Sequence, residues 1–577
     1  MLAADINMLK CAADANCQFH APYREWLDRQ HQRPDAWYIT WVIRSATAAL
    51  LAAVAPAAPA RADNLTITIA IDAATGRHAI SPLIYGVAFG APADLTQLGV
   101  PLNRSGGNSE SMYNWLLNAT NLGQDWYFES YPSTSAAPGG DGDTFIRQSK
   151  SAGAAPMLTI PMIGWVAKLG PNRAILPSFS VAKYGAQCQV DPYLADAGDG
   201  IHTDCSTDIV DNNPDDANQP DTPAAEQAWV KHLVATWGGA AKGGLRHYIM
   251  DNEPSIWFST HRDVHPVGPH ATEIRDKVIH TSRAVKAIDS AAKVVAPEEW
   301  GWEGYLYSGY DQQYAAQHGY SYYPDRTTEQ NGVDYIPWLL KSWKAAGHPV
   351  DVLSVHFYPQ GGEYSEDTST AMQLLRNRST RQLWDPTYVS ESWINAVVEL
   401  IPRLQGWVHD FYYAGTPVAV TEYNWGAENA INGATAQADI LGIFGRYGLN
   451  MATRWTVPAA TTPTYKAMQI YRNYDGRHSA FGDTAITAVV PNPDNLSAFA
   501  AIRSSDGAMT VMVINKVLTG ATPVTLKLAN FAASGTAQVY RLTAANVIAR
   551  LPNRAWSNGK LGDTEPPQSI TLYVLPK

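Results

Sequence analysis

The chain has 577 residues, of which 16% are charged and 46% hydrophobic, and its formal net charge is −11. This composition supplies a large core and excludes general disorder, while the absence of any basic run makes nucleic acid and anionic membranes poor partners. No stretch reaches the roughly 20 uninterrupted apolar residues of a membrane span. The 19 Trp and 29 Tyr outnumber the 12 Phe. This favours half-wet surfaces, because Trp and Tyr combine a flat apolar face with a polar edge.

The N-terminal region has the features of an export signal. Residues 45–62 read SATAALLAAVAPAAPARA, an apolar region that ends in an Ala-Arg-Ala triplet. This pattern predicts a secretory signal, so we expect a secreted, extracellular protein and exclude residues 1–62 from the fold as an N-terminal extension and signal. The alternative is an Ala-rich helix of the folded protein, which is less favoured because Pro56 and Pro59 break such a helix.

Residues 83–476 alternate short strand-like runs with longer amphipathic stretches that have helical spacing. Strands rich in Val, Ile and Leu, each followed by a helix, indicate a parallel sheet. Eight of them predict an α/β fold, a closed (β/α)₈ TIM barrel, as the catalytic domain. The candidate strands are 83–90, 100–108, 155–162, 245–254, 293–300, 351–359, 417–425 and 449–455. The candidate helices between and after them include 226–238, 272–290, 335–346, 396–413, 435–448 and 462–474.

Two cysteines and many acidic residues mark one long segment of this region. Cys11 and Cys17 belong to the excluded segment, which leaves Cys188 and Cys205. In an exported protein such a close pair favours a disulfide over two free thiols, worth about 3 kcal/mol through loop closure. The loop 187–222 is long and rich in Asp, and we weigh a structural Ca²⁺ bound there as one expectation. A solvated loop is favoured slightly, because the spacing matches no known calcium loop.

Beyond residue 476 the strand-like segments have no helices between them. They are 484–491, 496–504, 508–516, 522–531, 536–543 and 568–576. This pattern predicts a small antiparallel β-sandwich. The segment 65–72 alternates in the same way, so we expect 63–82 and 477–577 to build one sandwich domain from both ends of the mature chain. Its strands show no row of exposed aromatics, which favours bracing of the barrel over glycan binding.

The strand ends that carry acidic residues predict the chemistry, because the active sites of such barrels lie at the C-terminal ends of the strands. The fourth strand ends in Asn252-Glu253 and the seventh in Glu422, on opposite sides of an eight-strand ring. Two opposed carboxylates, one protonated and one ionised, are what glycoside hydrolysis needs. We expect a separation of about 5–5.5 Å for retention, whereas about 6.5–9.5 Å would indicate inversion.

Several residues are candidates to support these two carboxylates. Asn252 is placed to donate to a sugar 2-hydroxyl, which requires a bulge or an irregular strand end, because adjacent side chains on a regular strand point to opposite faces. Arg104, His356 and Tyr358 are candidates to hold Glu422 ionised, although His356 is equally well explained as a hydrogen-bonded core histidine.

Other carboxylates and motifs are weaker candidates. Glu298, Glu299 and Glu129 rank lower, as supporting or surface groups. No cluster of His, Asp and Glu has catalytic-metal spacing, and Gly106-Gly107 is too short for a phosphate loop. Several aromatics fall at or after strand ends and would stack on sugar rings along a cleft, although some are expected to be core residues. These aromatics are Trp115, Trp126, Tyr127, Trp393 and Trp455.

From about residue 83 to the C-terminus the sequence resembles glycoside hydrolase family 44, a family of endo-β-1,4-glucanases and xyloglucanases. The segments that carry the resemblance are NRSGGNSESMYNWLLNATNLGQDW, YIMDNEPSIW, VLSVHFYPQGG, TRQLWDPTYVSESWI and VAVTEYNWGAENAINGATAQAD. The resemblance implies a barrel fused to a sandwich made from both chain ends, hydrolysis with retention, Glu253 as acid/base and Glu422 as nucleophile. Some members carry a metal in the barrel domain, but the resemblance does not identify ligands for it in this sequence. Ser105 departs from the family, which is expected to have a larger residue, often Trp, at this position.

The same resemblance implies which positions contact glucan, namely Asn108, Trp126, Asn252, Tyr388, Trp393 and Trp455. We therefore expect a retaining, endo-acting hydrolase of β-1,4-glucan chains of the cellulose and xyloglucan type, without a catalytic cofactor. The alternatives are a related retaining barrel hydrolase of mannan or xylan, and a carbohydrate-binding protein without catalysis.

Overall fold

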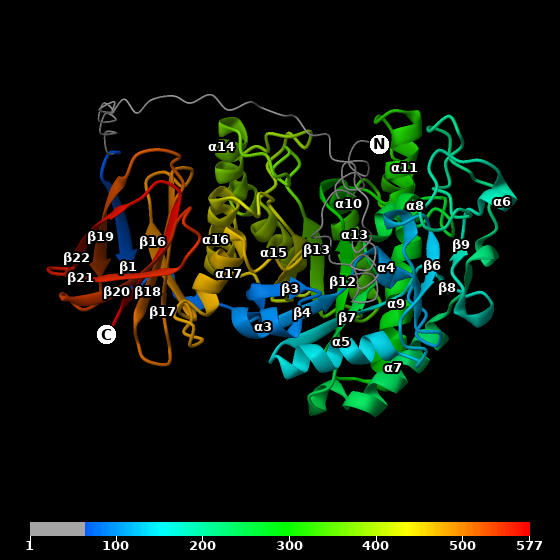
Figure 1. Ribbon diagram of the computed structural model, residues 1–577, viewed down its shortest axis with the longest axis horizontal. Coiled ribbons are helices and arrows are strands. Elements are labelled where there is room, and N and C mark those ends of the chain that lie inside the picture. Colours follow the sequence, from blue (N-terminus) through cyan, green and yellow to red (C-terminus); the bar gives the residue numbers. More distant parts are fainter. Residues whose placement is uncertain (1–63) are drawn as a thin grey trace, which may run out of the picture.

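The computed structural model describes residues 64–577. The predicted signal and the cysteines Cys11 and Cys17 lie outside the described residues. Figure 1 shows two bodies side by side, a helix-covered barrel and a sheet-rich body in which the dark blue strand β1 lies among orange and red strands. Within this part of the chain, no helix has the length and apolar character needed to cross a bilayer.

The predicted fold class is confirmed. Eight parallel strands close into a barrel in the order β3, β4, β7, β11, β12, β13, β14, β15. Their bounds are β3 (Gly86–Ala88), β4 (Leu102–Ser105), β7 (Ala155–Ile160), β11 (His247–Met250), β12 (Lys293–Glu299), β13 (Val352–Phe357), β14 (Val418–Tyr423) and β15 (Met451–Arg454). Each lies inside its predicted segment. The first predicted strand begins instead as the 3₁₀ turn η1 (Pro82–Tyr85), which Ser81 caps and Pro82 initiates.

Helices cover the outside of the barrel. The helices that follow the barrel strands include α3 (Pro92–Leu98), α5 (Gly140–Ser151), α7 (Pro223–Trp237), α9 (Ala271–Ile288), α13 (Tyr335–Ala345), α15 (Leu400–Phe411), α16 (Ile431–Arg446) and α17 (Pro463–Arg472). Their apolar residues recur at helical spacing, as in α9, where Ile274, Val278 and Val285 form one buried face. Additional helices lie in the connections: α4 (Asn108–Ser111), α6 (Val181–Tyr184), α8 (Trp257–Thr260), α10 (Trp302–Leu306), α11 (Gly309–His318), α12 (Pro324–Thr328) and α14 (Thr370–Ser379).

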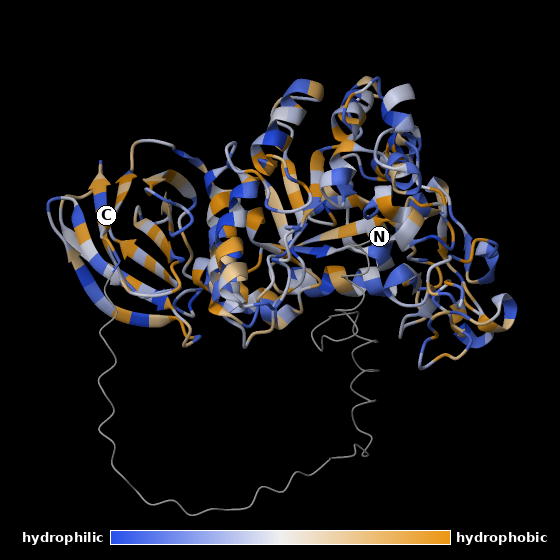
Figure 2. Ribbon diagram, turned by 90° about the horizontal axis from the view of Figure 1, so that it is seen from above, coloured by the Kyte–Doolittle hydropathy of each residue, from blue (hydrophilic) through white to orange (hydrophobic). Residues whose placement is uncertain are grey.

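The inside of the barrel has an apolar floor, to which seven strands contribute one buried residue each. These are Leu102, Met157, Ile249, Val295, Val352, Ala419 and Met451. Because side chains alternate along a strand, the residue two positions further on points inward again and lies closer to the C-terminal mouth. At that level the side chains are mostly polar and buried, for example Arg104, Ser354 and Thr421. Apolar residues, orange in Figure 2, run along the strands of both bodies.

The second body is a sandwich around its own apolar core. Its strands follow the hydrogen-bonded order β21, β20, β23, β18, β17, β16, β1, β19, β22. Their bounds are β1 (Ile67–Asp72), β16 (Thr484–Val489), β17 (Leu496–Ile502), β18 (Met509–Asn515), β19 (Thr522–Ala529), β20 (Gly535–Leu542), β21 (Ala549–Trp556), β22 (Lys560–Glu565) and β23 (Ser569–Leu575). The short β2 (His78–Ala79) pairs with β16. β1 lies between β16 and β19, so both chain ends build this domain.

Two sandwich strands, β21 and β22, were not predicted from the sequence. β21 is mostly exposed and contains Pro552, and it ends the hydrogen-bonded order as an edge strand. An edge strand tolerates proline and needs no apolar face, so its sequence lacks the alternation on which strand prediction depends.

Small sheets extend the barrel on the side away from the sandwich (Figure 1). They consist of β5 (Ala119–Asn121), β6 (Glu129–Pro132) and β9 (Leu176–Pro177), and of β8 (Trp165–Ala167) with β10 (Asn218–Pro220). The acidic loop that follows α6 contains a disulfide between Cys188 and Cys205, 17 positions apart. The predicted disulfide is therefore confirmed.

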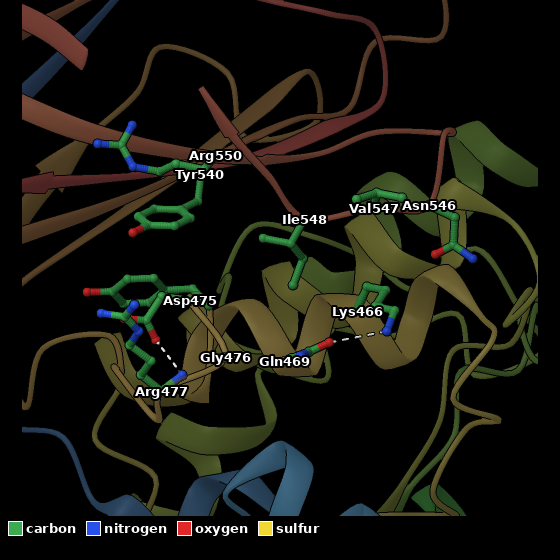
Figure 3. A pocket seen from close by; sticks show the side chains of 11 residues that line it. Lys466, Gln469, Asp475, Gly476, Arg477, Tyr540, Asn546, Val547, Ile548 and Arg550 are labelled. Carbon is green, nitrogen blue, oxygen red and sulfur yellow. Dashed lines mark hydrogen bonds between the residues drawn. The ribbon is translucent and has the colours of Figure 1, made fainter. Parts of the chain in front are cut away.

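The two bodies are tied together by a buried ion pair and share a pocket. Lys516 of the sandwich lies 2.5 Å from Asp439 of α16, and both side chains are buried. A pocket of about 770 Å³ opens between α17 and the hairpin of β20 and β21. Figure 3 shows its walls, with Tyr540 and Ile548 on the sandwich side and Gln469 on the barrel side. None of its lining residues is a predicted catalytic or substrate-binding residue.

Candidate active site

Glu422 reaches the mouth of the barrel because β14 is irregular. Ala419 belongs to the inner floor and Val420 to the outer core, so on a regular strand Glu422 would point outward with Val420. The pairing with β13 shifts from Val355↔Val420 to His356↔Glu422. This shift leaves Thr421 as an extra residue, and Thr421 and Glu422 both contact groups inside the barrel.

The ends of β11 and β12 are irregular in a similar way. Asp251 and Glu253 adopt positive φ values of 60° and 43°, and Glu298 adopts 60°. The pairing of β12 with β13 also shifts between Pro297 and Glu299. The irregular strand end that the Asn252-Glu253 pair required is therefore present. Such conformations cost free energy and concentrate at functional sites.

Glu422 is held by two donors. Arg104 Nη1 donates to Glu422 Oε1 over 2.7 Å, and the Tyr358 hydroxyl donates to Oε2 over 2.9 Å. Arg104 is fully buried. Burial alone would lower the pKa of Arg104, but the negative charges of Glu422 and Glu298 raise it. A permanently charged guanidinium therefore lies beside Glu422 and stabilises its ionised form.

Glu253 lies close to Glu422 and has a different environment. Its Oε1 is 2.8 Å from His356 Nδ1. One oxygen of each carboxyl group and one nitrogen of His356 lie within 4.8 Å of one another. Burial is the largest effect on Glu253, and together with the charge of Glu422 it raises the pKa above the ordinary glutamate value, against the opposing influence of His356. Burial and the neighbouring carboxylate thus favour the protonated form of Glu253.

His356 links Glu253 to a third carboxylate. Its Nε2 lies 3.1 Å from Glu298 Oε2, which also accepts from Arg104 over 3.0 Å. Burial would lower the pKa of His356, but the charge of Glu422 and hydrogen bonds to Glu253 and Glu298 raise it to about 9. Burial would likewise raise the pKa of Glu298, but Arg104 and His356 lower it to about 2. A buried imidazolium and guanidinium thus surround an ionised Glu298.

The sequence ranked Glu298, Glu299 and Glu129 as supporting or surface groups, and the surface assignment is wrong. All three are buried. Glu299 accepts from Ser255 Oγ over 2.5 Å, and burial raises its pKa to about 8. Burial also raises the pKa of Glu129, to about 9. Of the three, Glu298 contacts both Arg104 and His356.

A chain of hydrogen bonds leads from this centre toward Trp126. Asn252 Oδ1 accepts from Arg104 over 3.0 Å, and this fixes the orientation of its amide. Its Nδ2 then donates to Asn108 over 3.2 Å, and Asn108 donates to Asp125 over 3.1 Å. Trp126 is the next residue in the chain. Asn252, Asn108 and Asp125 therefore form a hydrogen-bonded series that starts at Arg104, and Trp126 follows its last member in the chain.

A second line leads from Glu422 in the direction of Trp393. Tyr358, which donates to Glu422, also accepts through its backbone oxygen from Gln360 Nε2 over 2.9 Å. Trp393 Nε1 donates to Gln360 Oε1 over 3.2 Å, and Trp393 is half exposed. Tyr388, from the same loop as Trp393, is buried. Its hydroxyl donates to Glu391 over 2.8 Å.

Trp455 lies against the glycine pair of the second strand end. Gly107 has a φ of 94°, and a side chain there would meet Trp455 at 2.8 Å. A side chain at Gly106 would meet the guanidinium of Arg104 at 2.3 Å. The pair is therefore needed for close packing beneath the site rather than for phosphate binding.

Among residues 64–577, two groups of His, Asp and Glu bring ligand atoms together, and neither lies in the loop 187–222. One is the group of Glu253, His356 and Glu422, and the other consists of His270, Asp325 and Glu329. In the second, Asp325 accepts from the backbone of α9 at Ala271 over 2.9 Å and from His270 over 2.7 Å. These bonds account for that group as a helix cap. The structural Ca²⁺ in the acidic loop stays a prediction.

We expect Glu298→Gln to lower the free energy of unfolding by about 3–5 kcal/mol, because it leaves the buried charges of Arg104 and His356 without their shared partner. The exposed pair of Arg275 and Asp276 provides a control, since Asp276→Asn should change stability by less than about 1 kcal/mol. Urea unfolding should be followed between pH 4.5 and 6.5, the ordinary pKa values of Glu and His.

Within this range both groups contribute fully, which follows from the direction of each shift. The lowered pKa of Glu298 gives stability that is lost only as pH falls from 4.5 toward about 2. The raised pKa of His356 gives stability that is lost only as pH rises from 6.5 through about 9. If Glu298→Gln and Asp276→Asn lowered the free energy of unfolding equally, the stabilising role of the buried ion cluster would be contradicted.

The comparisons with known proteins agree on one family. The model of glycoside hydrolase family 44 matches residues 119–361. The chain is 31% identical over 487 residues to Endoglucanase A of Paenibacillus lautus, a match that covers 78% of this chain and 64% of that relative. The match to a second curated relative covers 34% of the length of that relative. The chain thus spans between about one third and just under two thirds of the curated relatives that it matches.

Two solved structures resemble the whole described part. The crystal structure of CelM2, a bifunctional glucanase-xylanase protein from a metagenome library, is 58% identical with a TM-score of 0.88, and the match covers 89% of this chain and 99% of that one. The structure of a Paenibacillus polymyxa xyloglucanase from glycoside hydrolase family 44 is 28% identical with a TM-score of 0.73, and covers 89% and 100%.

Proposed function

Because the chain belongs to glycoside hydrolase family 44, we propose that it hydrolyses β-1,4-linked glucan chains internally and with retention of configuration. The observation that carries the proposal is the meeting of Glu253 and Glu422 at the mouth of the barrel. A carboxyl oxygen of one lies within 4.8 Å of a carboxyl oxygen of the other. This distance supports retention, since inverting enzymes separate their carboxyl groups by about 6.5–9.5 Å to admit a water molecule.

In the first step Glu422 attacks the anomeric carbon. The carbon–oxygen bond to the leaving sugar breaks, that oxygen takes the proton of Glu253, and a glycosyl ester forms on Glu422. The charge on Glu422 that the attack requires is supported by Arg104 and Tyr358, which donate to its two oxygens. The proton on Glu253 is supported by its raised pKa.

In the second step water releases the sugar. Glu253, now ionised, takes a proton from water, the water oxygen bonds to the anomeric carbon, and the ester bond to Glu422 breaks. The change of role has a physical cause, because the negative charge of Glu422 is one of the effects that raise the pKa of Glu253. The ester removes that charge, so the pKa of Glu253 falls as it becomes the base. The reaction uses only these carboxylates and water, without a cofactor.

The sugar beside the reacting bond would be oriented by Asn252. Arg104 and the backbone N–H of Gly107 both donate to Asn252 Oδ1, over 3.0 and 3.2 Å. The amide nitrogen therefore provides the donors on the other side, and only one of its two hydrogens is used by Asn108. The remaining hydrogen is placed to bond a sugar hydroxyl such as the 2-hydroxyl.

Substrate choice and stereochemistry together test this function. We expect new reducing ends on carboxymethyl cellulose and xyloglucan, with the β-anomer formed first, as followed by proton NMR. Xylan and mannan belong in the panel, because CelM2 is described as a glucanase-xylanase and a mannan or xylan hydrolase is the alternative. An α-anomer as first product would overturn retention, and binding without new reducing ends would indicate a carbohydrate-binding protein.

Secretion is part of the proposal. Its support is the signal pattern of residues 45–62 and the disulfide of the barrel domain, since disulfides persist in oxidising compartments. The proposed partner is a neutral polysaccharide. We propose neither a nucleic acid nor a membrane as a partner.

A further inference from the structure

A half-exposed tyrosine lies beside Trp126 at the end of the first hydrogen-bonded line. Tyr193 is 51% exposed. Its ring centroid lies 6.5 Å from that of Trp126, and the two planes differ by 19°. The two rings therefore form a stacked aromatic pair. A sugar chain that runs past this pair would meet both aromatic side chains in succession.

The loop that carries Tyr193 is held in place at its tip. Val190 and Gly198 form a backbone bridge on the two sides of the tip. The buried carboxylate of Asp191 accepts from the backbone N–H of Tyr193 over 3.1 Å. The N–H of Asp191 donates to Ala197 over 2.8 Å. The disulfide crosses the same loop, so Tyr193 has a fixed backbone before any ligand binds.

The segments that carry the two rings share one small core. Phe128, two residues after Trp126, packs with Phe179 and Ile209 in a buried cluster. The guanidinium of Arg262 covers the ring of Phe128 at 4.4 Å. This core joins the turn of Trp126 to the segments before and after the Tyr193 loop. A prearranged pair of rings loses little conformational entropy when a ligand binds.

We propose that Tyr193 forms an outer sugar-binding subsite next to Trp126, at the end of the line that starts at Asn252. Its ligand is a neutral β-1,4-linked chain, because the Asp-rich loop around Tyr193 disfavours anionic sugars. The subsite would extend the substrate contacts beyond the hydrogen-bonded residues Asn108 and Asp125, so we expect only long substrates to reach it. The inference rests on the proposed function and adds a determinant of substrate length to it.

The test compares cellotetraose and cellohexaose as substrates of the wild type and of Tyr193→Ala. We expect kcat/KM for the longer substrate to fall by about 2- to 12-fold, the range for one aromatic contact, mainly through KM. The value for the shorter substrate should stay unchanged. Tyr193→Phe retains the ring and should restore most of the difference. Tyr413→Ala is the matched control, since Tyr413 is similarly exposed but precedes β14, at the opposite end of the barrel.

Each outcome decides between the subsite and its alternatives. Equal loss on both substrates would show a structural role, and no loss on either would show that sugar does not reach Tyr193; both overturn the inference. If the wild type cleaves neither substrate, the proposed function fails instead. Calorimetric binding of cellohexaose to Glu422→Ala, with and without Tyr193→Ala, then decides the subsite separately, because it requires no turnover.

Discussion

Glu422→Ala is expected to lower kcat on soluble β-1,4-glucan by about 10⁴-fold or more, since removal of a nucleophile in a covalent mechanism leaves only binding and electrostatic contributions. The fold should persist, because Arg104 retains its bonds to Glu298 and Asn252. Reducing-end release measures the loss, and circular dichroism measures the fold. Glu329→Ala, a substitution at the end of α12, should retain most of the activity.

Azide provides a sharper test of the role of Glu422. With a 2,4-dinitrophenyl β-cellobioside, azide entering the space left by the side chain would attack the anomeric carbon from the face of Glu422 and displace the phenolate. The product would be the α-glycosyl azide, with inverted configuration. Near wild-type activity of Glu422→Ala, or an azide product of retained configuration, would show that another residue is the nucleophile.

Glu253→Gln is expected to lower kcat on the same glucan by about 10²- to 10⁴-fold, the usual contribution of a general acid. The 2,4-dinitrophenyl glycoside should behave differently, because its leaving group needs no proton. Its first step should proceed, and the glycosyl ester should accumulate for want of a base. Azide needs no base, so it should speed turnover and give the β-glycosyl azide, with retained configuration. Failure of azide to do so would remove Glu253 from the second step.

The pH profile gives an independent check on Glu253. Its pKa is raised above the ordinary glutamate value, chiefly by burial. An acid must hold its proton to act, so wild-type kcat/KM should fall on the alkaline side as Glu253 ionises, at a pH above that of an ordinary glutamate. Glutamine does not titrate, so this alkaline fall should disappear in Glu253→Gln. An unchanged alkaline limb would assign it to another group.

The sequence predicted the fold from local patterns. Each of the eight barrel strands was visible as an apolar run before a helix, and the strand of residues 65–72 was visible by its alternation. The pair Cys188 and Cys205 was visible by spacing. β21 was not visible, because an exposed edge strand carries no apolar alternation.

The residues of the candidate site likewise include some that the sequence places in the barrel and some that it does not. Arg104 and His356 follow regular alternation from the floor residues Leu102 and Val352, so strand position alone directs them inward. Glu298 does not, because a positive φ and a register shift with β13 turn it into the barrel. Tyr193 gave no signal either, since its place beside Trp126 depends on the path of a long loop.

The sequence alone predicted the architecture, the disulfide and the two acidic strand ends. Periodicity and residue type are local properties, and neighbouring segments do not alter them. The tertiary structure decided which side chains meet and which protons they hold. Strand bulges are set by pairing with adjacent strands. The opposite pKa shifts of Glu253 and Glu298 arise from burial and from charges more than 40 residues away in the chain.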